Sequence, residues 1–295
     1  MNELKRSNMP IKKIHVLRQL WVLIVAVGIV LFTIADLTLR LTNNVILFPT
    51  VMLIGTFLIP VAFTAYFYQQ ENLFDNGLHA GSILPTLLMC ALFGGLIGAL
   101  AASILESKFS SNNSLLSLMW VGPIEEFAKL IVPIAIFVIM RKRFRSEMDG
   151  LLFGVAAGMA FAVLESLGYE FITLINSHGS LLAVNDTILV RGLLSPMGHA
   201  SWTGLITATI WHERERKRNI VALVVMGFFL ISASLHSLWD FVSSLNNMTI
   251  IITSYIAIGG LSLGLLTWRV REAEAQRAES KSQFDSAKVL NSLVT

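Results

Sequence analysis

Residues 20–40 of the chain read LWVLIVAVGIVLFTIADLTLR, an apolar stretch with one acid, Asp36, before the closing Arg40. A helix that crosses a bilayer needs about 20 mostly apolar residues. Seven further stretches of this kind follow, so spans are predicted at approximately 20–40, 45–68, 83–105, 115–140, 150–175, 187–211, 219–242 and 247–268. The sequence therefore predicts an all-α protein, a polytopic bundle of about eight transmembrane helices.

The composition of the 295-residue chain agrees with this prediction, because 55% of its residues are hydrophobic and only 14% are charged. Soluble globular chains carry about 25% charged residues. The low charge excludes a disordered protein and an ordinary cytosolic enzyme. The single cysteine, Cys90, excludes a scaffold held by internal disulfides.

The Lys and Arg residues divide unevenly between the two predicted sides of the membrane. Positively charged loops stay in the cytoplasm. With the N-terminus inside, the cytoplasmic segments hold 18 Lys and Arg residues, and the opposite side holds 2, Arg40 and Lys108. The other two are Lys129, inside a span, and Arg191, which is expected to be interfacial or, as the minor alternative, to contact substrate from the outer leaflet. This asymmetry places both termini in the cytoplasm, and it accounts for the basic charge without a nucleic-acid partner.

Three segments follow from this topology. Residues 1–19 form a basic cytoplasmic N-terminus, residues 20–268 form the transmembrane domain, and residues 269–295 form a charged cytoplasmic tail. The tail is expected to be a short helix or a disordered end. Because the loops between spans are short, we expect the function to lie within the helices.

Ionisable side chains recur inside four consecutive predicted spans, where each costs about 2.5–3.5 kcal/mol on insertion scales. In chain order they are Glu125, Glu126, Lys129, Glu165, His199, His236 and Asp240. At a rise of about 1.5 Å per residue, their predicted depths fall in one layer between the membrane centre and its outer boundary. We therefore expect these side chains to converge on a common site.

The spacing of these residues suggests how they pair. Glu125 and Lys129 are four residues apart and are expected to neutralise each other in part, which leaves Glu126 as the more independent acid. His236 and Asp240 are also four apart, so the carboxylate is placed to orient the imidazole.

Two other local features bear on the site. Pro123 precedes the paired acids, where a proline kinks a helix and frees backbone carbonyls. Gly154 and Gly158 are four residues apart, a spacing of small residues that predicts close helix packing.

A dry pocket with several carboxylates and two histidines suits the activation of a water molecule. We hypothesise that Glu125 or Glu126 acts as the general base, and that a nearby acid or histidine protonates the leaving amine. Alternatively, Glu165, His199 and His236 supply two imidazoles and one carboxylate for a divalent metal such as zinc. The motif H-E-x-x-H is absent, so the sequence leaves the cofactor undecided.

The same motifs resemble those of the PrsW intramembrane proteases, which are distantly similar to the type II CAAX prenyl proteases. The matching stretches are Glu-Glu-x-x-Lys at 125–129, Phe-x-x-x-Glu at 161–165, Gly-His at 198–199 and His-x-x-x-Asp at 236–240. They follow the family's order within residues 115–242. The CAAX enzymes carry Arg after their paired acids and His where Glu165 stands, so this sequence follows the PrsW pattern.

The resemblance implies a multi-pass protease of the bacterial inner membrane that cuts a single-span or membrane-associated protein. In the best-known branch of the family, the substrate is an anti-sigma factor cut on its extracytoplasmic side. By position the resemblance assigns catalysis to Glu125, Glu126, Glu165, His199, His236 and Asp240, and it makes Lys129 the basic partner of the paired acids. The family is described as both metallo- and glutamate-type, so metal dependence stays open.

Two alternatives use the same residues differently. A proton- or cation-coupled transporter would use the acids as a relay. A non-catalytic membrane regulator of the same fold would act by binding alone.

Overall fold

The computed structural model describes residues 19–74, 82–109, 115–217 and 222–294. Within these ranges the elements are all helical, as predicted. They are α1 (Leu20–Thr42), α2 (Phe48–Phe74), α3 (Leu84–Phe109), α4 (Leu115–Ile139), α5 (Glu147–Asn176), α6 (Leu181–Leu194), α7 (Ser201–Lys217), α8 (Ala222–Ser243) and α9 (Met248–Val294). A 3-10 turn (Val45–Leu47) precedes α2, and a π-helical turn (Pro196–Ala200) joins α6 to α7. The predicted N-terminal segment, except for residue 19, lies outside the described residues.

Six helical segments of the described chain are long and apolar enough to cross a membrane. They are Leu20–Thr42, Val45–Gln70, Leu84–Phe109, Glu147–Asn176, Ala222–Ser243 and Met248–Gln276. The predicted fourth span coincides with α4, which is 25 residues long but contains three charged residues. The predicted sixth span runs through the end of α6, the π-helical turn and α7. These two segments carry polar residues of the candidate site, which reduces their apolar length. The count of eight spans and the side on which the termini lie stay predictions.

The last helix is longer than its predicted span. α9 covers 47 residues and continues from the apolar segment through the predicted tail as one helix. Arg269 of α9 lies 2.9 Å from Glu147 Oε1 at the start of α5, and 2.8 Å from Glu272 Oε2. Glu147 Oε2 in turn lies 2.7 Å from His212 Nδ1 on α7. These contacts tie α9 to the bundle where it leaves its apolar segment.

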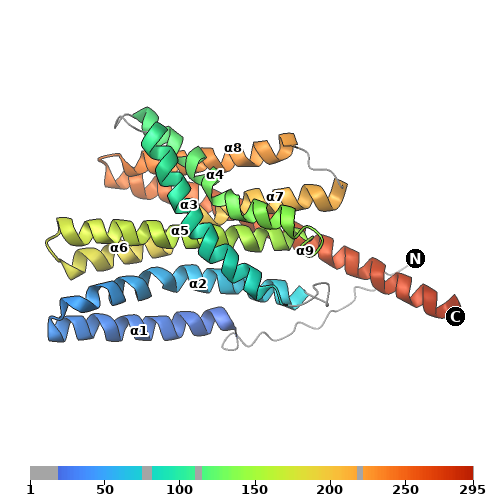
Figure 1. Ribbon diagram of the computed structural model, residues 1–295, viewed down its shortest axis with the longest axis horizontal. Helices are drawn as coiled ribbons and strands as arrows, with labels where there is room; N and C mark the ends of the chain where they lie inside the picture. Colours follow the sequence, from blue (N-terminus) through green and yellow to red (C-terminus); the bar gives the residue numbers. More distant parts are fainter. Residues whose placement is uncertain (1–18, 75–81, 110–114, 218–221, 295) are drawn as a thin grey trace, which may run out of the picture.

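Helix α5 is the central element of the bundle. It packs against α2, α3, α6 and α7, and more than half of its residues are buried. Figure 1 shows α1, α2, α5 and α6 side by side, with α3 crossing obliquely, and α4, α7, α8 and α9 toward the other side. The site residues on α5 therefore face helices from both parts of the bundle.

Two glycines on α5 permit its close contact with the following helices. A Cβ atom at Gly154 would meet the hydroxyl of Thr207, and one at Gly158 would meet the backbone carbonyl of His199. The predicted close packing at these positions is therefore present. Its consequence at Gly158 is that the backbone of His199 lies directly against α5.

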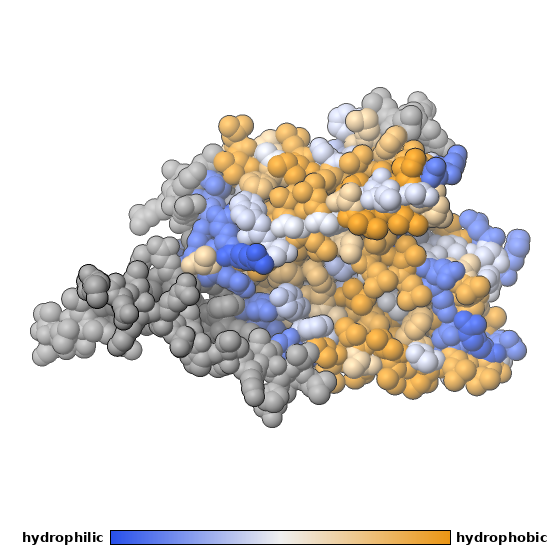
Figure 2. Space-filling model, turned by 180° about the vertical axis from the view of Figure 1, so that it is seen from behind, coloured by the Kyte–Doolittle hydropathy of each residue, from blue (hydrophilic) through white to orange (hydrophobic). Residues whose placement is uncertain are grey.

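The surface has the pattern expected of a bundle surrounded by lipid. Figure 2 shows hydrophobic residues over the middle of one face, with hydrophilic residues toward both ends. Large apolar side chains such as Leu100, Val30 and Leu230 are exposed on α3, α1 and α8. Since exposed apolar surface of this extent is unfavourable in water, these helices are those of a multi-pass membrane protein.

Candidate active site

Lys129 of α4 lies at the centre of a buried polar cluster. Its side chain is fully buried, and its Nζ lies 3.0 Å from Glu125 Oε2, 2.8 Å from Glu126 Oε1 and 2.9 Å from His199 Nδ1. An ammonium group has three N–H donors, so these three acceptors use all of them. Lys129 thus joins both acids of α4 to the π-helical turn.

Glu126 is the most extensively bonded acid of the site, contrary to the expectation that it would be the more independent one. It is completely buried and accepts hydrogen bonds from Lys129 Nζ, from Thr203 Oγ1 at 3.0 Å and from His236 Nδ1 at 3.0 Å. These donors belong to α4, α7 and α8. Helical spacing reveals only neighbours on the same helix, and two of these three donors come from other helices.

His236 of α8 is held on both its edge and its face. Its Nδ1 contacts Glu126, while its Nε2 lies 3.5 Å from Glu125 Oε2 and 3.7 Å from Asp240 Oδ2. We assign the ring proton to Nδ1, because the carboxylate there accepts it, and this leaves the Nε2 lone pair for chemistry. His236 and Asp240 are neighbours as predicted, but the carboxylate that orients the ring is Glu126 and not Asp240.

The face of His236 packs against a tryptophan that the sequence indicated only as a packing residue. The rings of His236 and Trp202 are stacked, with centroids 4.4 Å apart and an interplanar angle of 24°. Trp202 is itself fixed by a hydrogen bond from Nε1 to Ser262 Oγ of 2.9 Å. Helix α9 therefore helps to orient His236 through Trp202.

His199 joins the Lys129 cluster to Glu165 on α5. Its Nε2 lies 3.0 Å from Glu165 Oε2, and the same oxygen lies 2.9 Å from Arg191 Nη2. Arg191 was expected to be interfacial, and its side chain lines a cavity beside the cluster. The signal in the sequence was that Arg191, like Lys129, falls inside a predicted span, whereas Arg40 only ends one.

The proline of α4 also has the consequence expected of it. Pro123 has no N–H to donate to the carbonyl of Met119, four residues earlier. Ser237 Oγ of α8 donates to that carbonyl at 2.9 Å. The freed carbonyl therefore fixes α8 against α4.

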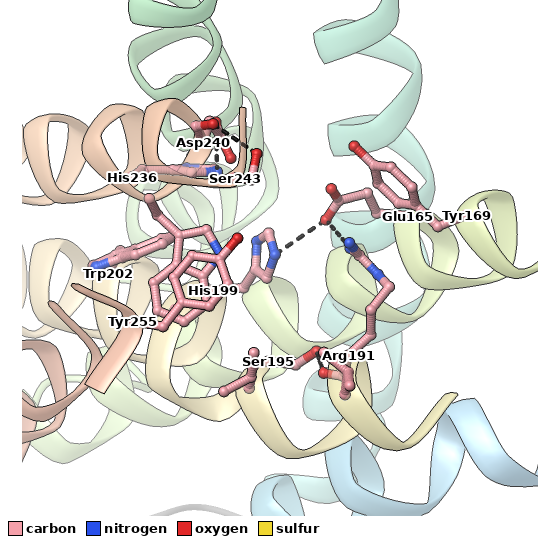
Figure 3. A pocket seen from close by; sticks show the side chains of 14 residues that line it. Glu165, Tyr169, Arg191, Ser195, His199, Trp202, His236, Asp240, Ser243 and Tyr255 are labelled. Atoms are coloured by element: carbon pink, nitrogen blue, oxygen red, sulfur yellow. Dashed lines mark hydrogen bonds and ion pairs between the residues drawn. The ribbon is translucent and has the colours of Figure 1, made fainter. Parts of the chain in front are cut away.

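A cavity of about 160 Å³ opens beside these residues. Figure 3 shows Glu165, His199, His236 and Asp240 around it, with Arg191 and aromatic rings on its walls. The buried Oδ2 of Asp240 accepts no hydrogen bond from any described residue. Neither Glu125 nor Glu126 lines this cavity. The structure thus brings all seven predicted residues into one cluster, but it divides them between a cavity wall and a buried support.

A metal set is present, with one residue different from the predicted one. Glu125, His199 and His236 each offer a ligand atom, and these atoms lie within 4.8 Å of one another. Two imidazole nitrogens and one carboxylate oxygen match the protein ligands of catalytic zinc sites, and the Glu126–His236 contact is the usual outer-shell support. The residues therefore fit such an ion. Because Lys129 contacts Glu125 and His199, its ammonium would compete with a cation for those two side chains.

A multi-helix membrane bundle with a buried cluster of acids and histidines beside a polar cavity has the architecture of an intramembrane hydrolase. The sequence model described as PrsW family intramembrane metalloprotease matches residues 83–265, which is more than half of the chain. The chain belongs to this family and is an intramembrane protease. The matched range contains every residue of the cluster.

One curated relative supports the same assignment. The chain is 26% identical to the protein named Protease PrsW of Halalkalibacterium halodurans over 182 residues, which is 61% of this chain and 77% of the relative. No solved structure matches the chain. Because the family is one of proteases, its match does not favour the transporter or the non-catalytic regulator.

Proposed function

We propose that this protease hydrolyses a peptide bond of a single-span or membrane-associated protein in the cavity bounded by Glu165, His199, His236 and Asp240. The observation that carries this proposal is the cavity itself. Two imidazoles and two carboxylates line one cavity of about 160 Å³, inside a bundle that exposes apolar side chains over the middle of the face in Figure 2. This arrangement is suited to general acid–base catalysis.

We assign the general base to Glu165, although the sequence favoured Glu125 or Glu126. Glu165 lines the cavity and is about one quarter exposed, and its ion pairs with Arg191 and His199 use only Oε2. Its Oε1 has no partner among the described residues. Glu126, by contrast, accepts three hydrogen bonds and is completely buried.

The chemical steps then follow from these positions. Glu165 takes a proton from water as the water oxygen bonds to the carbonyl carbon, and the carbonyl electron pair moves to its oxygen. When this pair returns, the C–N bond breaks and Glu165 gives the proton to the leaving amine. Glu126 and Trp202 hold His236 so that it can contact the water, and Asp240, one turn further along α8, lines the same cavity.

A divalent metal such as zinc, held by Glu125, His199 and His236, would lower the pKa of water and polarise the substrate carbonyl. Glu126 supports His236 with or without this ion, whereas Lys129 would compete with the ion for His199. The chelator test described below decides whether the protein is active with or without the metal.

The position of the cavity supports cleavage near the extracytoplasmic side. Its lining includes Tyr169, Ser243 and Tyr255, which lie near the helix ends that join α5 to α6 and α8 to α9. In Figure 1 these connections lie at the end opposite the C-terminus. The basic stretches 141–145 and 214–217 lie at the other ends of these helices, and basic segments stay in the cytoplasm. The proposed substrate class therefore includes anti-sigma-factor-like proteins of a bacterial inner membrane.

The test is cleavage of a library of single-span peptides by the purified protein in detergent, with fragments identified by mass spectrometry. The assay is repeated with 1,10-phenanthroline and after zinc is restored. Glu165→Gln is expected to abolish cleavage. Its matched control is Glu170→Gln, because Glu170 is buried on the same helix but bonds to Thr56, away from the cavity. Equal loss in both variants, or full activity of Glu165→Gln, would contradict the proposal.

A further inference from the structure

Arg191 is held in the cavity wall by three residues of α5. Its Nη2 lies 2.9 Å from Glu165 Oε2, its Nε donates to Ser166 Oγ at 2.9 Å, and its Cζ lies 4.1 Å from the ring centroid of Tyr169. These contacts come from two successive turns of one helix, so they fix the plane of the guanidinium. Figure 3 shows the group beside Glu165, on the opposite wall from Asp240.

The guanidinium has more donors than these contacts use. Arg carries five N–H groups, and Ser166 and Glu165 account for two. In the described part of the chain, no other acceptor contacts Arg191. Its side chain is 23% exposed, and the surface it exposes faces the cavity. Since unpaired donors in a largely enclosed site are costly, the group is suited to an acceptor on a bound molecule.

Lys129 cannot serve this purpose. It is completely buried, and its three N–H groups already contact Glu125, Glu126 and His199. Among the described residues that line the cavity, Arg191 is thus the permanent cation with donors to spare.

Arg191 also lies at the right distance from the reacting groups. Arg191 Nη2 and His199 Nε2 are both within 3.0 Å of the same oxygen of Glu165, so they are no more than about 6 Å apart. A peptide group that enters the cavity therefore meets the guanidinium and the Glu165 carboxylate at the same wall. Its carbonyl carbon then faces the water activated by Glu165, and its carbonyl oxygen reaches the guanidinium.

We propose that Arg191 donates a hydrogen bond to the scissile carbonyl oxygen and stabilises the negative charge that forms there when water adds. This inference rests on the proposed function. No atom is transferred by Arg191: the carbonyl electron pair moves onto oxygen beside the guanidinium and returns when the C–N bond breaks. Ser166 and Tyr169 are positioning residues, because they act through Arg191.

The experiment compares Arg191→Ala and Arg191→Lys with wild type on a peptide that wild type cleaves in the library assay. Removal of one oxyanion donor typically lowers kcat by about 10²–10³-fold, and this loss is expected for Arg191→Ala with little change in KM. Arg191→Lys keeps the charge without the planar fork and is expected to lie between. Methylguanidinium is expected to restore part of the activity of Arg191→Ala. The control is Arg40→Ala, which removes an ion pair with Asp36 on α1, outside the cavity.

A second readout separates this role from support of Glu165. The probe is the cleaved peptide with a phosphinate in place of the scissile amide, which mimics the tetrahedral oxyanion. Arg191→Ala, also in a Glu165→Gln background, is expected to weaken phosphinate binding by at least tenfold and to leave binding of the parent peptide unchanged. Equal weakening for both ligands, or wild-type kcat in Arg191→Ala, would overturn the proposed oxyanion contact of Arg191 and leave the proposed function standing. If wild type cleaves no peptide, the proposed function fails, and this inference fails with it.

Discussion

Glu126 offers the sharpest test of how the buried cluster supports catalysis. Glu126→Ala removes an acceptor shared by Lys129, Thr203 and His236, which belong to three helices. Breaking a buried ion pair by removing one partner typically costs 3–5 kcal/mol. Because Glu125 stays 3.0 Å from Lys129 and still pairs with it, we expect the lower end, about 3 kcal/mol.

Glu126→Gln separates charge from shape at the same position. Its amide oxygen can still accept from Lys129 and His236, and its NH2 group can donate to the hydroxyl of Thr203. We therefore expect a smaller loss of stability than for Glu126→Ala. The rate should still fall by about 10–100-fold, the usual cost of losing an outer-shell carboxylate on a functional histidine.

The measurements are equilibrium unfolding in mixed micelles with increasing SDS, and kcat on the cleaved single-span peptide. Membrane insertion, followed by fractionation, should be unchanged in both variants. If Glu126→Ala unfolds and cleaves like wild type, the buried cluster does not support the site and the reasoning is wrong. If it unfolds like wild type but is inactive, Glu126 acts directly on the substrate, contrary to its complete burial.

Three other predictions use matched variants on the same helices. Gly158→Ala should lower activity at least tenfold, because the added Cβ meets the backbone carbonyl of His199. Gly168→Ala places its Cβ in open space and should leave stability unchanged or raise it by up to about 1 kcal/mol. Unfolding and cleavage assays of both variants test this pair. If the protein binds zinc, Glu125→Gln should lower the zinc content measured by mass spectrometry and Glu165→Gln should not. Loss of zinc in Glu165→Gln alone would instead support the ligand set predicted from the sequence, with Glu165 in place of Glu125. Trp202→Ala should lose about 3–5 kcal/mol of stability as a buried tryptophan, and Trp202→Phe, which keeps a ring against His236 but loses the bond to Ser262, should lose less in SDS unfolding.

Much of the fold was readable from local sequence. The apolar stretches predicted helices close to α1, α2, α3, α5, α8 and α9, because the length of an apolar run and the absence of charge are local properties. The sixth predicted span falls on helical segments but missed the break between them at Pro196–Ala200. A π-helical turn depends on how the backbone packs against α5, which local periodicity does not report.

The sequence predicted which residues form the candidate site, but it did not predict the role of each one. Ionisable residues in a membrane are costly, so their presence in four successive spans marked them as a group. Glu126 was expected to be the more independent of the paired acids, but it accepts hydrogen bonds from three side chains. The metal set contains Glu125 where the sequence analysis had named Glu165. Arg191 was expected at the interface and lines the cavity.

The sequence by itself therefore determined that this is a helical membrane protein and which polar side chains share one layer of it. Both follow from free energies of transfer and from helical rise, which depend on residues near one another in the chain. Only the tertiary structure decided which acid supports a histidine, which acid faces the cavity and where the guanidinium of Arg191 points. Those outcomes depend on distances of about 3 Å between side chains on different helices, and these distances are set by how the helices pack rather than by spacing along any one of them.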